Sequence, residues 1–416
     1  MHAPWRSAGL TSNALLAVKC AHGIAPERVR ESLERLLDVC PWPAARLRRR
    51  WPWGKLHWAA GPRGTLAPPP VRYRALATSA DLDRELEVEL NTTLDPRRGP
   101  LLRILIGDVG DGPRARGVLV LTWFHPLMDP RGAQTLLASL DALDRDARCE
   151  GPSAMLPPAA RRPLAERGRI ARRSLAYMQT LAPTPPVSPG TGLVAPGQHR
   201  FRRERFVDRD SGARGKRFTR EISWRVAVVG RAMAELWSRR GLPDTPFLLP
   251  ISVDLRPRGE PGPIFGNHLA FHFARFRPSE TADVPALARM LRTQMADAVR
   301  DGQVEANQVA MEFLHHRPVA RMMRPLPWTR GGETFSFNCA DIGEMSPSLD
   351  RIFGTAVLDA CHVPAVLPRP GIGVFFNRCA SGTNLVVSWV EGAVSEGEVS
   401  RIMEVVREEM GWVRAP

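Results

Sequence analysis

The chain has 416 residues, which is enough for two domains of about 200 residues each. Its 44% apolar and 24% charged residues are typical of a soluble globular protein, and no apolar run approaches the roughly 18–20 residues that span a bilayer. The net charge of +15 favours an anionic partner, but no nucleic-acid motif or basic repeat with interleaved aromatic residues is present, so we expect no nucleic-acid binding.

The N-terminus and the cysteines predict a cytoplasmic protein. The short apolar piece Ala14–Val18 has no basic cluster before it, which argues against a secretory signal. The cysteines form no Cys-x-x-Cys pair, which predicts free thiols in a reducing compartment and no zinc site. The six positions are Cys20, Cys40, Cys149, Cys339, Cys361 and Cys379.

The first part of the chain alternates helical and strand patterns. Apolar residues at helical spacing after Pro26 predict a helix over about 26–39, and leucines at positions 82, 86 and 90 mark a second helix. Strands are expected at about 101–108 and 118–124, followed by a helix from 130 to about 143. This alternation favours an α/β architecture.

One histidine and one aspartate stand out at the end of the second strand. The buried strand 118–124 delivers His125 at its end, and Asp129 before Pro130 has the form of a helix start, an Asp N-cap with proline at the first helical position. A titratable imidazole between a strand and a helix is a common place for a catalytic group. Spacing alone leaves the alternative open that His125 is an ordinary turn residue and Asp129 only a cap.

The middle of the chain is strongly basic. Between Glu150 and Arg220 there are 15 Arg and Lys residues against 5 Asp and Glu residues, which gives +10 of the total +15. Five prolines and three glycines in 182–197 predict an extended linker, and 163–181 predicts an amphipathic helix. A phosphopantetheine carrier, coenzyme A or an anionic membrane surface all fit this charge, as does a solvated linker with a helix packed on its own domain.

The second part begins near Phe218. A helix over 227–240 ends before Gly241, and the last helix opens with the capping box Ser395–Glu398. His268 and His272 would share one face of a strand, but no third metal ligand is in view, so we expect packing and no metal site. The pair at 315–316 is expected on the surface. Strands are predicted at 247–253, 269–276, 373–376 and 385–390.

The segment around His125 is similar to the His-His-x-x-x-Asp-Gly signature of the chloramphenicol-acetyltransferase-like superfamily. This superfamily includes the condensation domains of non-ribosomal peptide synthetases, the wax ester synthase/diacylglycerol acyltransferases and the plant BAHD acyltransferases. In this alignment His125 takes the place of the catalytic histidine and Asp129 that of the structural aspartate. Phe124 replaces the first histidine and Pro130 replaces the glycine, which leaves catalytic competence open.

Further segments resemble the family in the expected order, although the plant Asp-Phe-Gly-Trp-Gly motif is absent. The segment 251–258 resembles the one that supplies an arginine to the aspartate, and 335–338 resembles the Ser-Asn floor-loop motif with Phe337 inserted. Two others are the stretch 90–103 before the histidine strand and the Gly-Asn element at 265–267. The resemblance therefore spans nearly the whole chain.

The resemblance implies two α/β subdomains with mixed sheets flanked by helices, over about 1–150 and 218–416, with the basic linker 151–217 and a tunnel that reaches His125. It implies a general-base role for His125 and an ion pair of Asp129 with Arg256, or otherwise with Arg258. The candidates for oxyanion or substrate contacts are Ser336, Asn338 and Asn267.

The implied activity is acyl transfer from acyl-CoA or an acyl carrier protein to a small-molecule alcohol or amine. We expect no cofactor, a monomer, and possible peripheral contact with an anionic membrane. No Gly-x-Ser-x-Gly motif is present, which favours direct transfer over an acyl-enzyme. A carrier-dependent condensation enzyme and a non-catalytic condensation-like scaffold remain as alternatives.

Overall fold

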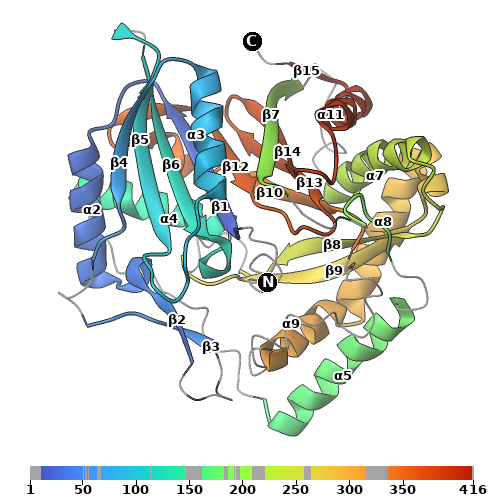
Figure 1. Ribbon diagram of the computed structural model, residues 1–416. Coiled ribbons are helices and arrows are strands. Elements are labelled where there is room, and N and C mark those ends of the chain that lie inside the picture. The colour runs from blue at the N-terminus through green and yellow to red at the C-terminus, as the bar shows by residue number, and fades with distance from the viewer. Residues whose placement is uncertain are drawn as a thin grey trace.

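Two sheets lie side by side at the centre of the molecule, with one helix between them and the others on their outer faces or below them (Figure 1). The computed structural model describes residues 11–49, 51, 54, 56–62, 67–112, 115–146, 162–181, 186–191, 193, 197–208, 221–256, 264–314, 333 and 335–414. Both large sheets are mixed, because each contains one parallel pair among antiparallel pairs. The expected α/β class with mixed sheets is confirmed.

The first sheet has the strand order β11-β12-β1-β6-β5-β4. Its strands are β1 (Asn13–Cys20), β4 (Val71–Leu76), β5 (Leu102–Val109), β6 (Arg116–Phe124), β11 (Arg351–Ile352) and β12 (Thr355–Pro364). Helices α2 (Pro26–Val39) and α4 (Pro130–Asp144) bury their leucines on one face of this sheet. Helix α3 (Ser79–Asn91) packs on the other face.

The second sheet has the order β10-β13-β14-β7-β15. Its strands are β7 (His199–Asp208), β10 (Asn338–Glu344), β13 (Ile372–Cys379), β14 (Gly382–Val390) and β15 (Trp412–Arg414). Helices α7 (Ile222–Arg239), α8 (Val284–Arg300) and α11 (Glu396–Met410) enclose a large apolar core on its outer face.

The inner faces of the two sheets enclose an apolar layer, here called the inter-sheet layer. It is built from side chains that are almost completely buried. From the first sheet they include Leu15, Ala17, Val118, Val120, Cys361 and Val363, from the second Phe201, Phe375, Val386 and Val390, and from α3 Leu82, Leu86 and Leu90. Burying this layer is favourable by about 25 cal/mol per Å² of apolar surface, so it holds the sheets together.

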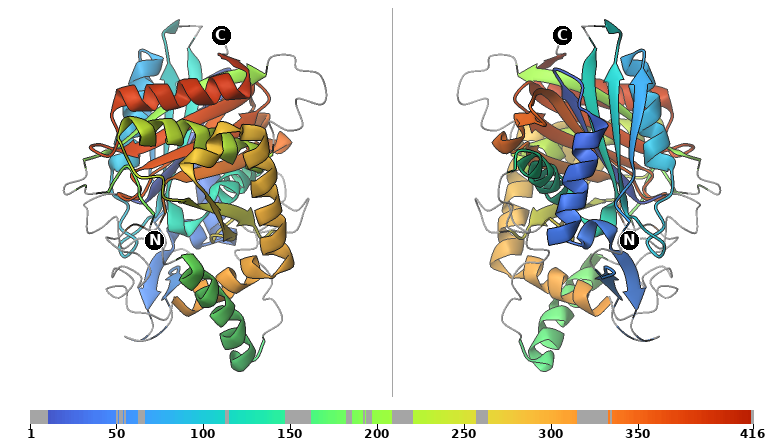
Figure 2. Two further views of the ribbon diagram at one scale, coloured as in Figure 1. Left: turned by 90° about the vertical axis from the view of Figure 1, so that its right-hand side faces the viewer. Right: turned by 90° about the vertical axis from the view of Figure 1, so that its left-hand side faces the viewer.

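Below the sheets lie two hairpins and two helices (Figures 1 and 2). The hairpins are β2 (Arg46–Arg49) with β3 (Leu56–Ala59), and β8 (Phe247–Asp254) with β9 (Leu269–Phe276). Helix α5 (Leu164–Leu181) packs against α9 (Gln303–Leu314) at the lower tip of the molecule. Short 3₁₀ turns lie at Trp42–Ala44, His125–Leu127, Pro278–Ala282 and Pro347–Leu349.

Local signals predicted several elements closely. Helix α2 and strand β9 have the expected bounds. The Asp129 side chain caps α4 by accepting from the Gly132 amide, and Ser395 forms the expected capping box with Glu398 at the start of α11.

The division of the chain differs from the expected one in two segments. Residues 355–364 fall in the expected second part, but they form β12, which pairs with β1 in the first sheet. Residues 199–208 were assigned to the linker, but they form β7, in which Phe201 and Phe206 are buried. Arg200 and Arg203 of this strand pair with carboxylates from other segments, as Arg203 does with Asp83 at 3.1 Å.

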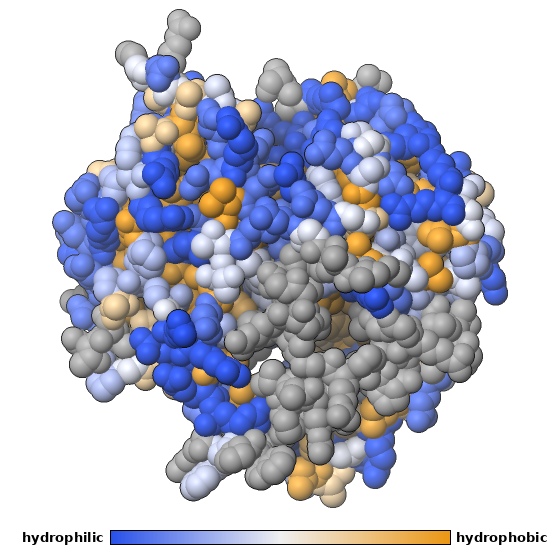
Figure 3. All heavy atoms as spheres, in the orientation of Figure 1, coloured by the Kyte–Doolittle hydropathy of each residue, from blue (hydrophilic) through white to orange (hydrophobic). Residues whose placement is uncertain are grey.

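Helix α5 buries less of its apolar stripe than expected. Ala171 is buried together with Ile170, but Leu164 remains 70% exposed and Leu175 48% exposed. Apolar patches are visible at the lower edge of the molecular surface, where α5 lies (Figure 3). In the part of the chain that the structure describes, no helix has the length and apolar character needed to cross a membrane.

Candidate active site

Strand β6 ends directly at His125. Its last eight residues, Gly117–Phe124, are all buried, so the strand is a rigid support. The backbone amide of His125 donates to the Ser12 carbonyl at 2.8 Å, which ties the turn to the start of β1. The imidazole is half-buried, and its Nδ1 has no hydrogen-bond partner among the described residues. The backbone of His125 is therefore held in place, while Nδ1 of its ring can still form a hydrogen bond.

Asp129 is only 1% exposed and accepts hydrogen bonds from three separate segments. Its Oδ1 accepts from the Gly132 amide at 3.0 Å and from Arg256 Nη2 at 2.9 Å. Its Oδ2 accepts from the His268 amide at 3.0 Å. The expected ion pair with Arg256 is present, and the Arg256 side chain is fully buried. The fallback partner Arg258 lies outside the described residues.

Asp254 orients Arg256 from the other side. Its Oδ1 accepts from the Arg256 backbone amide at 3.0 Å and from Nη1 at 3.2 Å, and its Oδ2 accepts from Arg131 at 2.7 Å. Burial alone would raise the pKa of Asp254, but these hydrogen bonds and cations outweigh it and lower the pKa below its ordinary value. The carboxylate therefore stays charged beside Arg256.

The segment Ile264–His268 completes the cluster by close backbone contact with the start of α4. The Gly266 amide donates to the Leu127 carbonyl at 2.7 Å, and Met128 forms a bridge with Gly266. A Cβ on Gly132 would lie 2.0 Å from the Ile264 carbonyl oxygen, so only glycine fits there. The turn after His125 is thus held by a chain segment more than 130 residues away.

This architecture is shared with known proteins. A trichothecene 15-O-acetyltransferase from Fusarium sporotrichioides matches with a TM-score of 0.70 and 11% identity over 98% of this chain and 92% of that one. The first condensation domain of the CDA synthetase matches with a TM-score of 0.65 and 13% identity over 98% and 92%. Polyketide synthase associated protein 5 from Mycobacterium tuberculosis matches with a TM-score of 0.61 and 16% identity over 99% and 96%.

The chain has the chloramphenicol-acetyltransferase-like fold. No family model and no curated protein sequence matches it.

Two departures from the signature of this superfamily are accommodated locally. Phe124 is 1% exposed and packs edge-on against Trp58 at a centroid distance of 6.3 Å. Pro130 lies in the first turn of α4, where no backbone N–H is needed, and the cap by Asp129 is intact. The backbone beside His125 therefore keeps a regular helix start despite the missing glycine.

The three candidate contact residues lie in different surroundings. Asn267 adjoins the Asp129 cluster, and its Oδ1 is buried without a partner among the described residues. Ser336 is hydrogen-bonded to β8, because its Oγ accepts from the Leu248 amide at 3.2 Å. Asn338 opens β10, where it pairs with Gly373. Among the described contacts, only Asn267 is brought next to the cluster that contains Asp129.

His362 on β12 is a buried residue near His125 that sequence reasoning missed. It is 1% exposed, and burial followed by the charge of His125 lowers its pKa to about 3. Its Nε2 lies 3.2 Å from Gln134 Nε2, and Gln134 Oε1 accepts from the Ser346 amide. The Gln134 amide nitrogen is therefore the donor, which places the proton of the neutral imidazole on Nδ1. The flanking Cys361 and Val363 give only an ordinary strand pattern.

Within the described residues, His268 and His272 do not form a common site. His268 Nε2 contacts the Phe265 carbonyl at 2.9 Å, whereas His272 is buried on β9 opposite Ile251. No group of three or more His, Cys, Asp or Glu residues that could hold a metal ion occurs in the described ranges. The pair at 315–316 lies outside the described residues.

Proposed function

We propose that this protein is an acyltransferase that moves an acyl group from a thioester to a hydroxyl or amine, with His125 as the general base. The coarse class is supported by a fold shared with condensation domains and an acetyltransferase. The observation that carries the proposal is the position of His125 at the end of a buried strand, directly before the Asp129–Arg256 cluster.

The reaction needs only proton transfer and oxyanion stabilisation from the protein. A neutral imidazole of His125 takes the proton of the acceptor as its oxygen or nitrogen attacks the thioester carbonyl. The tetrahedral intermediate then expels the thiolate, which receives the proton from the imidazolium. Asn267 is the best-placed candidate for an oxyanion or substrate contact, because part of its amide is buried and unsatisfied. Asp129 takes no part in the proton transfer, because Arg256 and two amides engage it.

The donor is proposed to be acyl-CoA or an acyl carrier protein. The basic middle segment supports an anionic donor only in part, because Arg162 and Arg167 are neutralised by Glu305 and Glu312. The cations of α5 that remain exposed, without an ion-pair partner in the described chain, are Arg169, Arg172 and Arg173. These three arginines, beside exposed leucines, are the surface on which we expect a carrier or an anionic membrane to dock.

The test is His125→Ala, assayed by thiol release from acyl-CoA with a panel of alcohols and amines. Turnover should fall by about 10²–10⁴, the usual effect of losing a general base, with an unchanged melting temperature. His22→Ala is the matched control, because His22 is exposed and lies near the opposite end of the first sheet. A folded His125→Ala protein with normal turnover would reject the assigned role.

The same assay separates the donor classes. Activity only with carrier-loaded acyl groups identifies a condensation-type enzyme. If neither donor supports product formation, but the protein binds a loaded carrier, it is a non-catalytic scaffold.

A further inference from the structure

A groove of about 440 Å³ lies at the end of the inter-sheet layer that is remote from His125. Strand β6 runs from Arg116 at this groove to Phe124 beside His125, and eight residue steps of about 3.3 Å separate them by roughly 26 Å. The polar lining residues are Lys19, Arg116 and Asp359 of the first sheet and Arg203, Arg205 and Asn384 of the second. The groove thus joins both sheets.

The positive charge of this groove is incompletely neutralised. Lys19 and Arg116 have no carboxylate partner within the described ranges, and Arg116 donates only to the Ala21 carbonyl, at 3.2 Å. Asp359 is the one carboxylate in the lining, and its Oδ1 accepts from Asn384 at 2.8 Å. Asp359 is also the cross-strand neighbour of Lys19, but one carboxylate faces the four cations of the lining, so the groove keeps a net positive charge.

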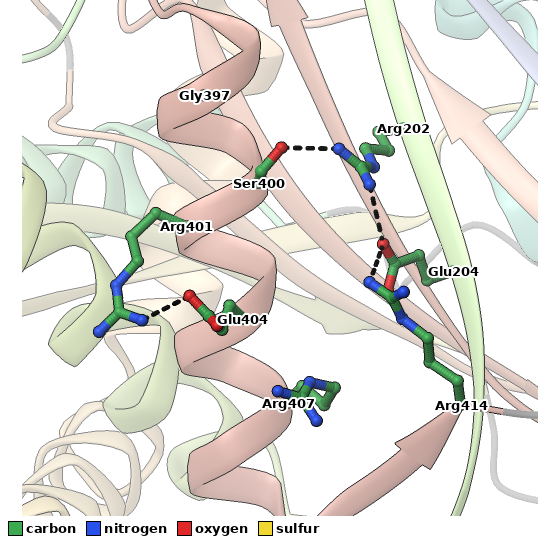
Figure 4. A pocket seen from close by; sticks show the side chains of 8 residues that line it. All are labelled: Arg202, Glu204, Gly397, Ser400, Arg401, Glu404, Arg407 and Arg414. Atoms are coloured by element: carbon green, nitrogen blue, oxygen red, sulfur yellow. Dashed lines mark hydrogen bonds and ion pairs between the residues drawn. The ribbon is translucent and has the colours of Figure 1, made fainter.

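A second groove, of about 510 Å³, shows the opposite arrangement (Figure 4). It lies between α11, β7 and β15, and its arginines pair with glutamates. The pairs are Arg202–Glu204 at 3.3 Å, Arg414–Glu204 at 2.9 Å, Arg401–Glu235 at 2.8 Å and Arg407–Glu408 at 3.7 Å. Many arginines in a groove therefore do not by themselves indicate an anion site in this chain. Cations that lack a carboxylate partner in a groove do indicate one.

A buried amide lies beside the first groove. Asn377 stands directly opposite Asn384 in the β13–β14 pair and is 1% exposed. Both its Nδ2 and its Oδ1 lack a hydrogen-bond partner among the described residues. A buried amide with neither group satisfied costs stability, so the position of Asn377 next to Asn384 points to a polar ligand or bound water at this end of the layer.

We propose that this groove binds a small phosphate ester of the sugar phosphate or nucleotide class and clamps the two sheets together. Lys19 and Arg116 hold the phosphate from the first sheet, and Arg203 and Arg205 approach it from the second. Asp359 is placed to accept a hydrogen bond from a sugar hydroxyl of the ester, a group that inorganic phosphate lacks. The volume suits a ligand of this size.

The site is independent of the proposed acyl transfer. The inter-sheet layer between the groove and the His125 end is filled with buried apolar side chains. A ligand in the groove acts on the sheets and not on the reacting atoms. By mass action, any ligand that binds only the folded state raises the melting temperature.

The experiment measures binding by titration calorimetry, and melting temperature, at constant ionic strength. The probes are adenosine 3′,5′-bisphosphate, ribose 5-phosphate and inorganic phosphate. We expect saturable binding of at least one ester, tighter than that of inorganic phosphate, with a higher melting temperature. A preference for the bisphosphate indicates a nucleotide, and a preference for ribose 5-phosphate indicates a sugar phosphate.

The decisive variant is Lys19→Gln/Arg116→Gln, which should weaken binding about tenfold or more. The matched control is Arg407→Gln/Arg414→Gln, which removes the same charge from the second groove and should leave binding unchanged. Asp359→Asn should abolish the preference for the ester over inorganic phosphate. Absence of saturable binding to the wild-type protein, or equal weakening by both double variants, overturns the proposal.

Discussion

Two buried carboxylates, Asp129 and Glu89, are both held by a buried arginine, yet they differ in what they join. Asp129 binds Arg256 and the His268 amide, which lie 127 and 139 positions further along the chain. Glu89 on α3 binds Arg103, only 14 positions away, and Thr122, which is 33 positions away. The Glu89 cluster therefore ties a helix to its own sheet, whereas the Asp129 cluster ties the His125 turn to the β8–β9 region.

This difference distinguishes residues that should affect both activity and stability from residues that should affect mainly stability. Both clusters place a charge in the interior, which is costly unless every partner is present. At Asp129 the partners also set the backbone beside the proposed base, so one change there should damage stability and activity together. Glu89 contacts the strand that carries His125 through Thr122, but it touches neither His125 nor Asp129 directly, so a change there should damage stability far more than turnover.

The largest effect is expected for Asp129→Ala. The change breaks the buried pair with Arg256, which keeps only its longer contact with Asp254, at up to about 3–5 kcal/mol, and it removes a helix cap worth about 1 kcal/mol. The free energy of unfolding from urea titration should fall by that amount, and turnover should fall in the fraction that stays folded. A variant that melts like the wild type would show that the buried pair contributes nothing.

A slightly smaller loss is expected for Glu89→Ala. This change leaves the Arg103 side chain buried without its carboxylate and should cost about 3–5 kcal/mol, with no cap involved. The turnover of the folded fraction, measured at low temperature, should match the wild type. Loss of turnover equal to that of Asp129→Ala would break the distinction between the two clusters.

The smallest effect concerns acid stability, because each region also buries a neutral histidine. Burial, with the charge of His125, lowers the pKa of His362 to about 3, and burial lowers that of His199 on the α3 side to about 4, from an ordinary value of 6.5. Below pH 6.5 the unfolded chain binds protons that these two imidazoles do not bind in the folded state. As the pH is lowered, each group therefore reduces the free energy of unfolding by at most about 1.4 kcal/mol per pH unit.

His362→Gln and His199→Asn should therefore each flatten the fall in unfolding free energy between pH 6.5 and pH 4. Urea titrations across this range measure the slope, and the carboxylates that also titrate there are common to all three proteins. Slopes identical to the wild type would mean that the two imidazoles are protonated in the folded state.

The local sequence pattern was sufficient to predict much of the fold. The leucines of α2, the Asp129 cap and the Ser395 capping box act within one or two turns of helix, so their effect is visible in the sequence itself. Strand β12 was not recognised, because polar Asp359 and His362 interrupt its apolar residues and its partner β1 lies more than 330 positions away. No local pattern encodes such a pairing.

The candidate site was likewise only partly predictable from the sequence. The Asp129–Arg256 pair was expected only from resemblance to a family, and periodicity alone would not have selected Arg256 from many arginines. The contact of the His268 amide with Asp129, and the burial of His362 beneath Gln134, depend on tertiary packing. The assignments of His125, Asn267, Ser336 and Asn338 to chemical roles stay predictions.

The place of β1 between β6 and β12 has a consequence for synthesis on the ribosome. Strand β6 ends at Phe124 and β12 begins at Thr355. At about 5–20 residues per second, roughly 10–50 s therefore pass before the strand that pairs with the second edge of β1 is synthesised. During this interval β1 is an apolar edge strand that can pair with another nascent chain. Expression yield should therefore respond to translation speed and chaperone supply between residues 124 and 364, even in variants whose finished fold is as stable as the wild type.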